Sequence, residues 1–337
     1  MILIDKDFKK PCVLNIYKPK GVSSLHVVKQ LKNKIGNKKL RIGHFGTLDS
    51  FAEGILLIGI NGASRMNEYV HEYLPKTYLA RGKLGTKMDT GDWTGQVTGT
   101  DTTDYLNTVI AKFDVEFLNA QFKAKFEGEY WQAPPAYSAA KYEGKRLHEW
   151  ARDGVIIQKE KKLRQIYKVE VVKYDFPNLE IRFQVSSGTY IRTLFEDCAQ
   201  HLGTLGYLQE LVRENIGQIN LDSTIDSKLI ETPEFQLLDE KALDPLSVLP
   251  LSRIQLDAAD TVNYGQGRTV LVKESTQHEK QRVWVTDSLG EVIGLAQLEN
   301  SELRPLFNFP YAIDSIQHSA LQRKLADSLK TVGSSAT

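Results

Sequence analysis

The chain is poor in cysteine and has no long apolar run. Its two cysteines, Cys12 and Cys198, have neither the spacing of a metal site nor the number that a disulfide framework needs. No run of about 18 apolar residues occurs, so a membrane-spanning helix is not expected. The N-terminal residues lack a basic stretch followed by an apolar one, which argues against a signal peptide. These absences predict a cytoplasmic protein without a membrane partner.

Acidic residues are also missing from one long segment. Between Phe8 and Leu48 there is no Asp or Glu, whereas the same segment contains ten Lys or Arg side chains. The rest of the chain is acidic, with 33 basic and 42 acidic residues, although the whole protein has a net charge of only +1. Residues 141–168 form a second basic segment, with nine basic and four acidic residues. Segregated cations of this kind suit a polyanion such as nucleic acid, and a lysine-rich solvated surface is the alternative.

The pattern of apolar residues and turn signals predicts an α+β protein. Residues 12–17 and 55–60 are apolar runs typical of buried strands, and a helix is expected from Ser24, as N-cap, to Ile35. Residues 165–174 and 179–186 are predicted to pair as strands. The remaining expected elements are strands at 77–84 and 205–219 and helices at 104–113, 189–202 and 320–329.

The pattern of predicted elements changes near residue 250. Short strand patterns at 268–273, 282–286 and 292–298 follow a polar, proline-containing connector. We therefore expect a large domain and a small β-rich one, followed by a polar tail that is partly helical or disordered. The expected boundaries are 1–250, 251–313 and 314–337.

The loop from Gly43 to Gly54 is the first candidate for a functional site. Its glycines allow sharp turns or a close approach of the backbone to a ligand. Asp49 lies within it and is the first acidic residue after the cationic segment. A carboxylate among cations can serve as a nucleophile or base, although an Asp in a loop is also a common turn-former or helix cap.

Five sequence blocks resemble, in order, those of the tRNA pseudouridine-55 synthase (TruB) family. The most specific is Gly-His-Phe-Gly-Thr-Leu-Asp at 43–49, followed by Gly-Ile-Leu at 54–56. A single block would be a weak signal, but five in order over residues 11–217 are specific. The other four blocks begin with Lys-Pro at 18–19, Lys-Thr-Tyr at 76–78, Gln132 of the Gln-x-Pro-Pro block and Ser-Gly-Thr-Tyr at 187–190.

The resemblance implies both a fold and a reaction. The fold is a pseudouridine-synthase-like mixed central sheet with flanking helices and a catalytic cleft, plus a small C-terminal domain resembling the PUA RNA-binding module. The reaction isomerises uridine to pseudouridine in the T loop of tRNA. It needs no redox step and no external group, so no cofactor and no metal are expected.

The resemblance also assigns catalytic roles. Asp49 would act on the ribose or on the base, which the sequence leaves open, and Arg192 would pair with it. Tyr78 would stack on the target base and help to remove its C5 proton. The residues alone favour structural roles instead, with Tyr78 and Tyr190 as core aromatics of a strand or helix and Arg192 as a helix-surface partner of Glu196.

The substrate-binding residues follow in the same way. The target uridine must leave its stack to react, and His44 would occupy the vacated place or else brace the loop. Tyr190 and Leu211 match positions that line the pocket of the family. The residues expected to hold phosphates and ribose are basic, and they are Lys18, Lys20 and Lys141.

The sequence departs from the family pattern at a few positions. Tyr17 stands where Asp is usual, Ser50-Phe51 replaces Pro-Leu after the catalytic Asp, and Val212 stands where Arg is frequent. None of these changes removes an expected catalytic group. Those beside Asp49 put the geometry of the loop, and hence activity or substrate preference, in doubt.

Other functions remain open from the sequence. One is a tRNA-binding folding chaperone with weak or lost catalysis. Another is a glycosidase-like hydrolase, which needs a second carboxylate, with Asp89 and Asp92 as candidates. The compact length favours a monomer that works without a guide RNA.

Overall fold

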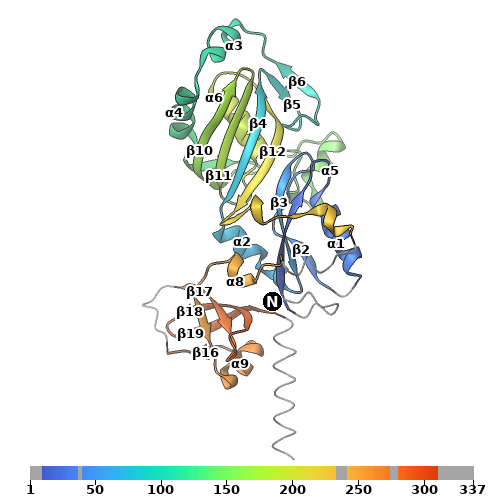
Figure 1. Ribbon diagram of the computed structural model, residues 1–337. Helices are drawn as coiled ribbons and strands as arrows, with labels where there is room; N and C mark the ends of the chain where they lie inside the picture. Colours follow the sequence, from blue (N-terminus) through green and yellow to red (C-terminus); the bar gives the residue numbers. More distant parts are fainter. Residues whose placement is uncertain (1–9, 37–39, 233–240, 274–279, 310–337) are drawn as a thin grey trace, which may run out of the picture.

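The computed structural model of the protein describes residues 10–36, 40–232, 241–273 and 280–309. These residues form a large body built on one mixed sheet and a smaller sheet below it (Figure 1). The expected α+β class with a mixed central sheet is therefore confirmed. The predicted tail at 314–337, including its helix, lies outside the described residues. Within the described ranges, no helix is long and apolar enough to cross a membrane.

The first half of the central sheet comes mainly from the N-terminal part of the chain. Strand β1 (Cys12–Lys18) pairs antiparallel with β3 (Glu53–Ile60) and parallel with β14 (Ile225–Asp226). β2 (Ile42–His44) pairs antiparallel with β3. Helix α1 (Ser24–Ile35) packs its apolar face on this half, because Val27, Val28 and Leu31 join a buried cluster with residues of β1 and β3.

Helix α1 begins one residue earlier than the sequence predicts. Ser23, and not Ser24, is its N-cap, since the Ser23 side chain accepts a hydrogen bond from the backbone N of His26 at 3.1 Å. Gly36 ends the helix with φ 71°, a left-handed conformation that glycine adopts without strain. Ser24 is left free to bond elsewhere in the molecule.

The second half of the sheet is antiparallel. Its strands follow the order β12 (Gly206–Ile216), β4 (Lys76–Leu84), β11 (Asn178–Val185), β10 (Lys162–Asp175) and β7 (Gly128–Gln132). The predicted pairing of the segments 165–174 and 179–186 is confirmed by β10 and β11.

Two helices cover one face of this second half. Helices α6 (Ile191–His201) and α4 (Val115–Phe126) supply Phe195, Phe122 and other apolar side chains to the largest buried cluster. The single helix expected over 104–113 is divided, because α3 (Asp104–Thr108) is followed by a separate 3₁₀ turn, η2 (Ile110–Lys112).

The two halves of the sheet meet along one short parallel contact. β3 and β12 pair through only two residue pairs, Val212 with Glu53 and Arg213 with Gly54. A Cβ on Gly54 would lie 2.4 Å from the carbonyl oxygen of Arg213, so only glycine permits this approach. The loop that contains Asp49 directly precedes β3, and the junction therefore fixes where this loop lies.

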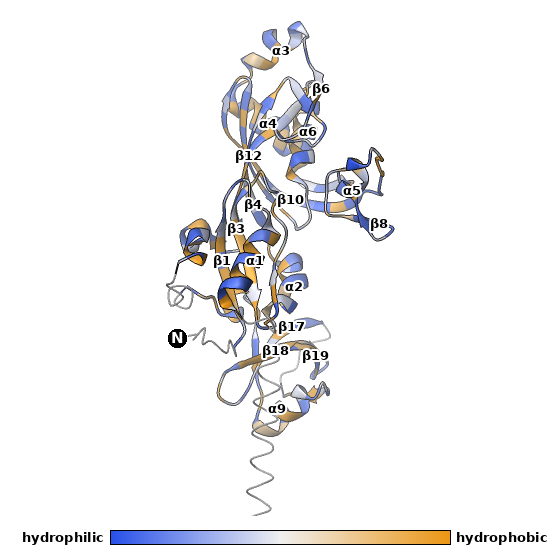
Figure 2. Ribbon diagram, turned by 90° about the vertical axis from the view of Figure 1, so that its right-hand side faces the viewer, coloured by the Kyte–Doolittle hydropathy of each residue, from blue (hydrophilic) through white to orange (hydrophobic). Residues whose placement is uncertain are grey.

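Shorter elements complete the body. Figure 2 shows β8 and α5 on an arm that projects from the side of the sheet. The short elements are η1 (Ala63–Met66), α2 (Asn67–Tyr73), β5 (Thr86–Met88), β6 (Val97–Thr100), β8 (Lys141–Tyr142), β9 (Lys145–Arg146), α5 (Leu147–Arg152), β13 (Ile219–Asn220), η3 (Leu221–Ser223), η4 (Ser227–Ile230) and α8 (Pro245–Val248).

The C-terminal part forms a five-stranded sheet, as the β-rich pattern predicts. Its strand order is β15 (Arg253–Gln255), β17 (Gln281–Thr286), β18 (Val292–Glu299), β19 (Glu302–Asn308) and β16 (Val270–Leu271). The sequence reading missed β19 and the helix α9 (Ala258–Gly265). The domain boundaries near residue 250 and residue 313 remain predictions.

The small sheet packs against the body through aromatic side chains. Trp284 is fully buried, its Nε1 donates to the carbonyl of Leu249 at 2.8 Å, and its ring stacks on Phe309 at 6.2 Å between centroids. Phe45 and Val70 of the body belong to the same buried cluster. One continuous core therefore joins the two sheets.

We expect Trp284→Ala to lower the free energy of unfolding by about 3–5 kcal/mol, because it leaves a large cavity in this shared core. Trp131→Ala is the matched control, since Trp131 is 58% exposed, and it should change stability by less than about 1 kcal/mol. Chemical denaturation of both variants measures the difference. Equal losses for the two would show that the aromatic junction does not stabilise the protein.

Candidate active site

The loop at residues 45–52 is anchored by buried side chains and by backbone hydrogen bonds. Phe45, Leu48 and Phe51 are buried, and Phe45 N donates to Leu57 O of β3 at 2.8 Å. The carbonyl of Ser50 accepts a hydrogen bond from Gly21 N at 2.8 Å. The unusual Ser50-Phe51 pair thus fits the loop, since Phe51 fills the core.

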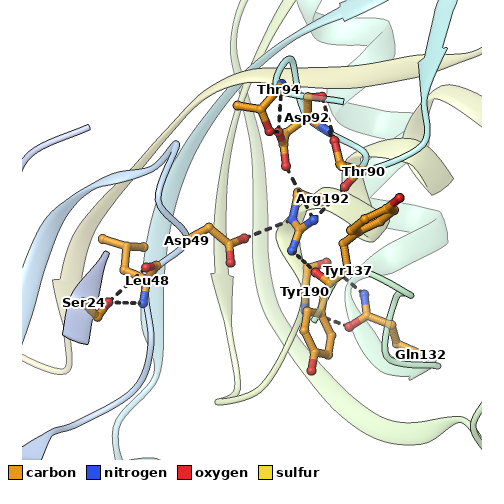
Figure 3. Close-up of polar contacts among 10 residues, drawn as sticks. All are labelled: Ser24, Leu48, Asp49, Thr90, Asp92, Thr94, Gln132, Tyr137, Tyr190 and Arg192. Carbon is orange, nitrogen blue, oxygen red and sulfur yellow. Dashed lines mark hydrogen bonds and ion pairs between the residues drawn. The ribbon is translucent and has the colours of Figure 1, made fainter. Parts of the chain in front are cut away.

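Two polar side chains fix the backbone on either side of Asp49. The buried Ser24 Oγ accepts from Leu48 N at 2.9 Å and donates to Leu48 O at 3.0 Å (Figure 3). Arg213, 1% exposed, directs its guanidinium to the carbonyls of Gly46 and Thr47, and its Nε donates to Ile55 O at 2.7 Å. The Asp49 carboxylate is therefore presented by a rigid backbone.

Asp49 and Arg192 are brought together, as the sequence leads one to expect. Arg192 Nε lies 3.0 Å from Asp49 Oδ2, and the two side chains approach from the loop and from helix α6 (Figure 3). The Asp49 side chain is 41% exposed and that of Arg192 only 6%. An open carboxylate is thus aimed by a buried guanidinium.

Arg192 has further partners that the sequence reading missed. Its Nη1 donates to Thr90 O at 2.6 Å and lies 3.5 Å from Asp92 Oδ2, while its Nη2 donates to Tyr137 O at 2.8 Å. The alternative partner considered from helical spacing, Glu196, forms no ion pair with Arg192 among the described residues. The guanidinium is therefore held in one orientation by four groups from three segments of the chain.

A pocket of about 350 Å³ opens beside Asp49. Its walls include Tyr78 from β4, Tyr190 before α6 and Leu211 from β12, and Tyr78 is 7% exposed. Gln132 clamps the backbone of Tyr190, accepting from its N at 2.7 Å and donating to its O at 3.0 Å (Figure 3). Tyr78 and Leu211 therefore come from strands of the second half of the sheet, and Tyr190 and Arg192 from the start of α6, whereas Asp49 comes from the loop in the first half.

A wider pocket of about 620 Å³ shares Asp49 and Arg192 with the first one. It extends to His44 on one side and to the basic arm on the other, where Lys141, Arg146 and Arg152 line it. Burial is the main cause that lowers the pKa of His44, so its imidazole is neutral at physiological pH. His44 and Lys141 thus both line one basic hollow next to the carboxylate.

A third pocket lies on the other face of the sheet, and its charged residues are arranged differently from those around Asp49. It measures about 570 Å³, and Arg81 in its wall pairs with Glu180 at 2.8 Å and with Glu210 at 2.9 Å. Asp49, Tyr78 and Arg192 do not line it. Its charges largely satisfy one another, which makes it a poor candidate for the functional site.

The expected phosphate contact of Lys18 does not fit the structure. Lys18 is fully buried, and its ammonium donates to the carbonyls of Ala52 at 2.6 Å, Val22 at 2.7 Å and Pro19 at 3.0 Å. Burial is the main cause that lowers its pKa to about 8. Lys18 ties β1 to the end of the catalytic loop. Lys20 is exposed and pairs with Glu210 at 2.6 Å, outside both pockets that contain Asp49.

The hydrolase reading is weakened by the surroundings of its candidate carboxylates. Asp92 accepts from Thr94 N at 3.0 Å through Oδ1 and faces Arg192 through Oδ2. Asp89 accepts from Gln96 N at 2.8 Å and from the Tyr137 hydroxyl at 3.2 Å. In both groups each oxygen faces a donor, so neither is placed to give a proton to a leaving group.

We expect Lys18→Met to lower the free energy of unfolding by about 1–3 kcal/mol, because three buried carbonyl groups lose their donor. Lys29→Met on the exposed face of α1 is the matched control and should be nearly neutral. Thermal or urea denaturation compares the two. A Lys18→Met protein as stable as the control would contradict a structural role for this ammonium.

Comparison with known proteins agrees with this geometry. A profile described as TruB family pseudouridylate synthase (N terminal domain) matches residues 32–191. The chain is 34% identical over 275 residues to tRNA pseudouridine synthase B of Dehalococcoides mccartyi, which covers 81% of this chain and 88% of the relative. It is 35% identical to the enzyme of the same name from Thermosipho melanesiensis, over 77% of this chain and 82% of the relative.

Solved structures show the same fold. The chain matches a Cbf5-Nop10-Gar1 complex with a TM-score of 0.65 and 19% identity, over 88% of this chain and 84% of the other. An archaeal box H/ACA sRNP Nop10-Cbf5 complex gives a TM-score of 0.63 and 18% identity, over 89% of this chain and 88% of the other. Together with the sequence relatives, these matches establish that the chain belongs to the TruB family of pseudouridylate synthases.

Proposed function

We propose that the protein isomerises uridine to pseudouridine in tRNA, at position 55 of the T loop. Family membership and relatives named tRNA pseudouridine synthase B support the reaction and the class of RNA. The observation that supports it most directly is the Asp49 carboxylate, held by Arg192 at the mouth of a pocket that also contains Tyr78. A volume of about 350 Å³ accommodates one flipped nucleoside.

The reaction breaks the bond from ribose C1′ to N1, turns the base, joins C1′ to C5 and releases the C5 proton, while N1 takes up a proton. Asp49 acts on the ribose or on the uracil base, and Arg192 aims its carboxylate through the contact at 3.0 Å. Tyr78, in the wall of the same pocket, stacks on the uracil and assists removal of the C5 proton. Leu211 and Tyr190 enclose the base.

The basic hollow next to the pocket suits the RNA strand around the target. His44 lies at its edge, close enough in the chain to Asp49 to fill the space that the flipped base leaves in its stack. Lys141 with Arg146 and Arg152 of the arm contacts phosphates, and Lys20 contributes from the surface.

We infer that the protein works as a cytoplasmic monomer without a guide RNA. Its relatives named tRNA pseudouridine synthase B are 34–35% identical, whereas the matched chains from Cbf5 complexes are 18–19% identical. A tRNA-folding role in addition to catalysis is compatible with the basic hollow. The retained catalytic geometry speaks against a protein that only binds.

Asp49→Asn is expected to lower conversion of uridine 55 in an unmodified tRNA transcript by at least about 10³-fold, as in enzymes that lose a nucleophile or base. The amide retains the shape of the side chain, so the dissociation constant for tRNA should stay within about threefold of the wild-type value. Nucleotide-resolution mapping of pseudouridine, together with a filter-binding titration, measures both quantities.

Asp104→Asn is the matched control, because Asp104 lies exposed on α3, at the far end of the sheet from α2 (Figure 1). It should convert tRNA at the wild-type rate. Conversion by Asp49→Asn at the control rate would refute the assigned role of Asp49. Tight binding of tRNA with no conversion by the wild-type protein would establish the chaperone alternative instead.

A further inference from the structure

Lys76 is a buried cation in the wall of the catalytic pocket. It is the first residue of β4 and is 3% exposed. Its ammonium donates to the hydroxyl of Ser187, which is the one hydrogen-bond partner of Lys76 in the described ranges. An ammonium has three donors, so two of them lack a protein partner here.

The pocket around Lys76 contains more positive than negative charge. Lys76, Arg192 and Arg213 line it together with the uncharged His71, against the single carboxylate of Asp49. Arg192 pairs with that carboxylate, and Arg213 is engaged by backbone carbonyls. No carboxylate of the described chain lies within ion-pair distance of Lys76. A buried charge without a partner is costly, which points to a ligand that brings negative charge.

We propose that Lys76 is a catalytic residue that stabilises the negative charge developing on the uracil when its bond to the ribose breaks. The inference rests on the proposed function. As the C1′–N1 bond breaks, its electron pair remains on the base and is shared with the ring oxygens. When C1′ is joined to C5, the electron pair forms the new bond. The C5 proton is then lost, its electron pair returns to the ring, and N1 takes up a proton, which gives the neutral isomer. The step needs no oxidant, reductant or co-reactant.

The position of Lys76 on the strand favours the base over a phosphate as its target. Side chains two residues apart on a strand point to the same face, so Lys76 and Tyr78 face the pocket together. A base stacked on Tyr78 therefore presents its edge to the part of the pocket wall that Lys76 forms. The phosphates of the same nucleotide lie beyond the ribose, toward the exposed Asp49 and the basic hollow.

The charges that face Lys76 make its protonation sensitive to pH. Burial, followed by the positive charge of Arg213 on β12, lowers the pKa of Lys76 to about 7. From α2, His71 also faces it, but burial lowers the pKa of this imidazole to about 4, so it is neutral. Asp49 on the loop and Arg192 on α6 complete the set, and they pair with each other. An anionic ligand would raise the pKa of Lys76 and keep it charged.

Lys76→Met tests the proposal, with Lys173→Met as the matched control because Lys173 is exposed on β10 outside both pockets that contain Asp49. We expect the single-turnover rate constant with tRNA to fall on the order of 10²–10³-fold, as when one donor to a developing oxyanion is removed. The dissociation constant for tRNA should change by less than about threefold, and the control should match the wild type. Lys76→Gln, which retains a donor to Ser187 without the charge, should lose rate to a similar extent.

The pH profile separates a charge from a structural role. In the wild type, kcat/KM should fall as pH rises above about 7, because the free enzyme loses the proton of Lys76. Both Lys76 variants should lack this alkaline limb. A variant that is slow but retains the limb would overturn the proposal, and so would a variant with the wild-type rate.

Two further outcomes are distinguished by binding and by the wild type. If Lys76→Met weakens tRNA binding and lowers the slope of log K against log salt by about one while the saturated rate is unchanged, Lys76 contacts a phosphate and the proposal is wrong. If the wild-type protein itself converts no uridine, the proposed function fails. A fully active wild type with an equally active Lys76→Met overturns only the inference about Lys76.

Discussion

The proposed catalytic centre depends on one buried guanidinium. Arg192 contacts Asp49 of the loop and Asp92 of the segment after β5, and it donates to the carbonyls of Thr90 and Tyr137. These groups belong to segments that are far apart in the sequence but meet at the N-terminal end of α6 (Figure 3). Because the fork of a guanidinium has fixed donor directions, the four contacts set the direction in which the carboxylate points. Without Arg192 the carboxylate would lose the one ion pair that orients it among the described residues.

The sheet explains why the carboxylate and the base-binding wall come from different halves. The parallel contact of β3 and β12 is only two residue pairs long, and it places the loop before β3 against the strand that supplies Leu211 and Arg213. Arg213 pairs with Gly54 through its backbone and holds the loop through its side chain. Arg213 thus sets the strand register between the two halves and also holds the loop in place. The glycine opposite it is required because any larger residue would separate the halves.

Much of the fold could be predicted from the sequence, and less of the site. Buried strands such as β3 and β4 can be recognised in the sequence because apolar runs and apolar–polar alternation reflect local burial. The contact of Asp49 with Arg192 was expected from the resemblance to the TruB family. The burial of Lys18, however, depends on where three carbonyls from two loops meet, and no local pattern records that. The contact of Asp92 with Arg192 could not be predicted for the same reason, since the distance between them is set by the folding of a remote turn.

The C-terminal sheet also supports the pocket, because helix α2 contacts the small sheet on one side and lines the pocket on the other. On one side of α2, Arg282 pairs with Glu72 and lies over the rings of Tyr69 at 5.2 Å and Tyr73 at 5.5 Å. From the same helix, His71 lines the catalytic pocket, and a Cβ on Gly46 would lie 3.3 Å from its ring. A helix of two turns cannot shift on one side without moving the other. The small sheet and the loop that presents Asp49 therefore rest against the same short helix, whether or not that sheet touches RNA.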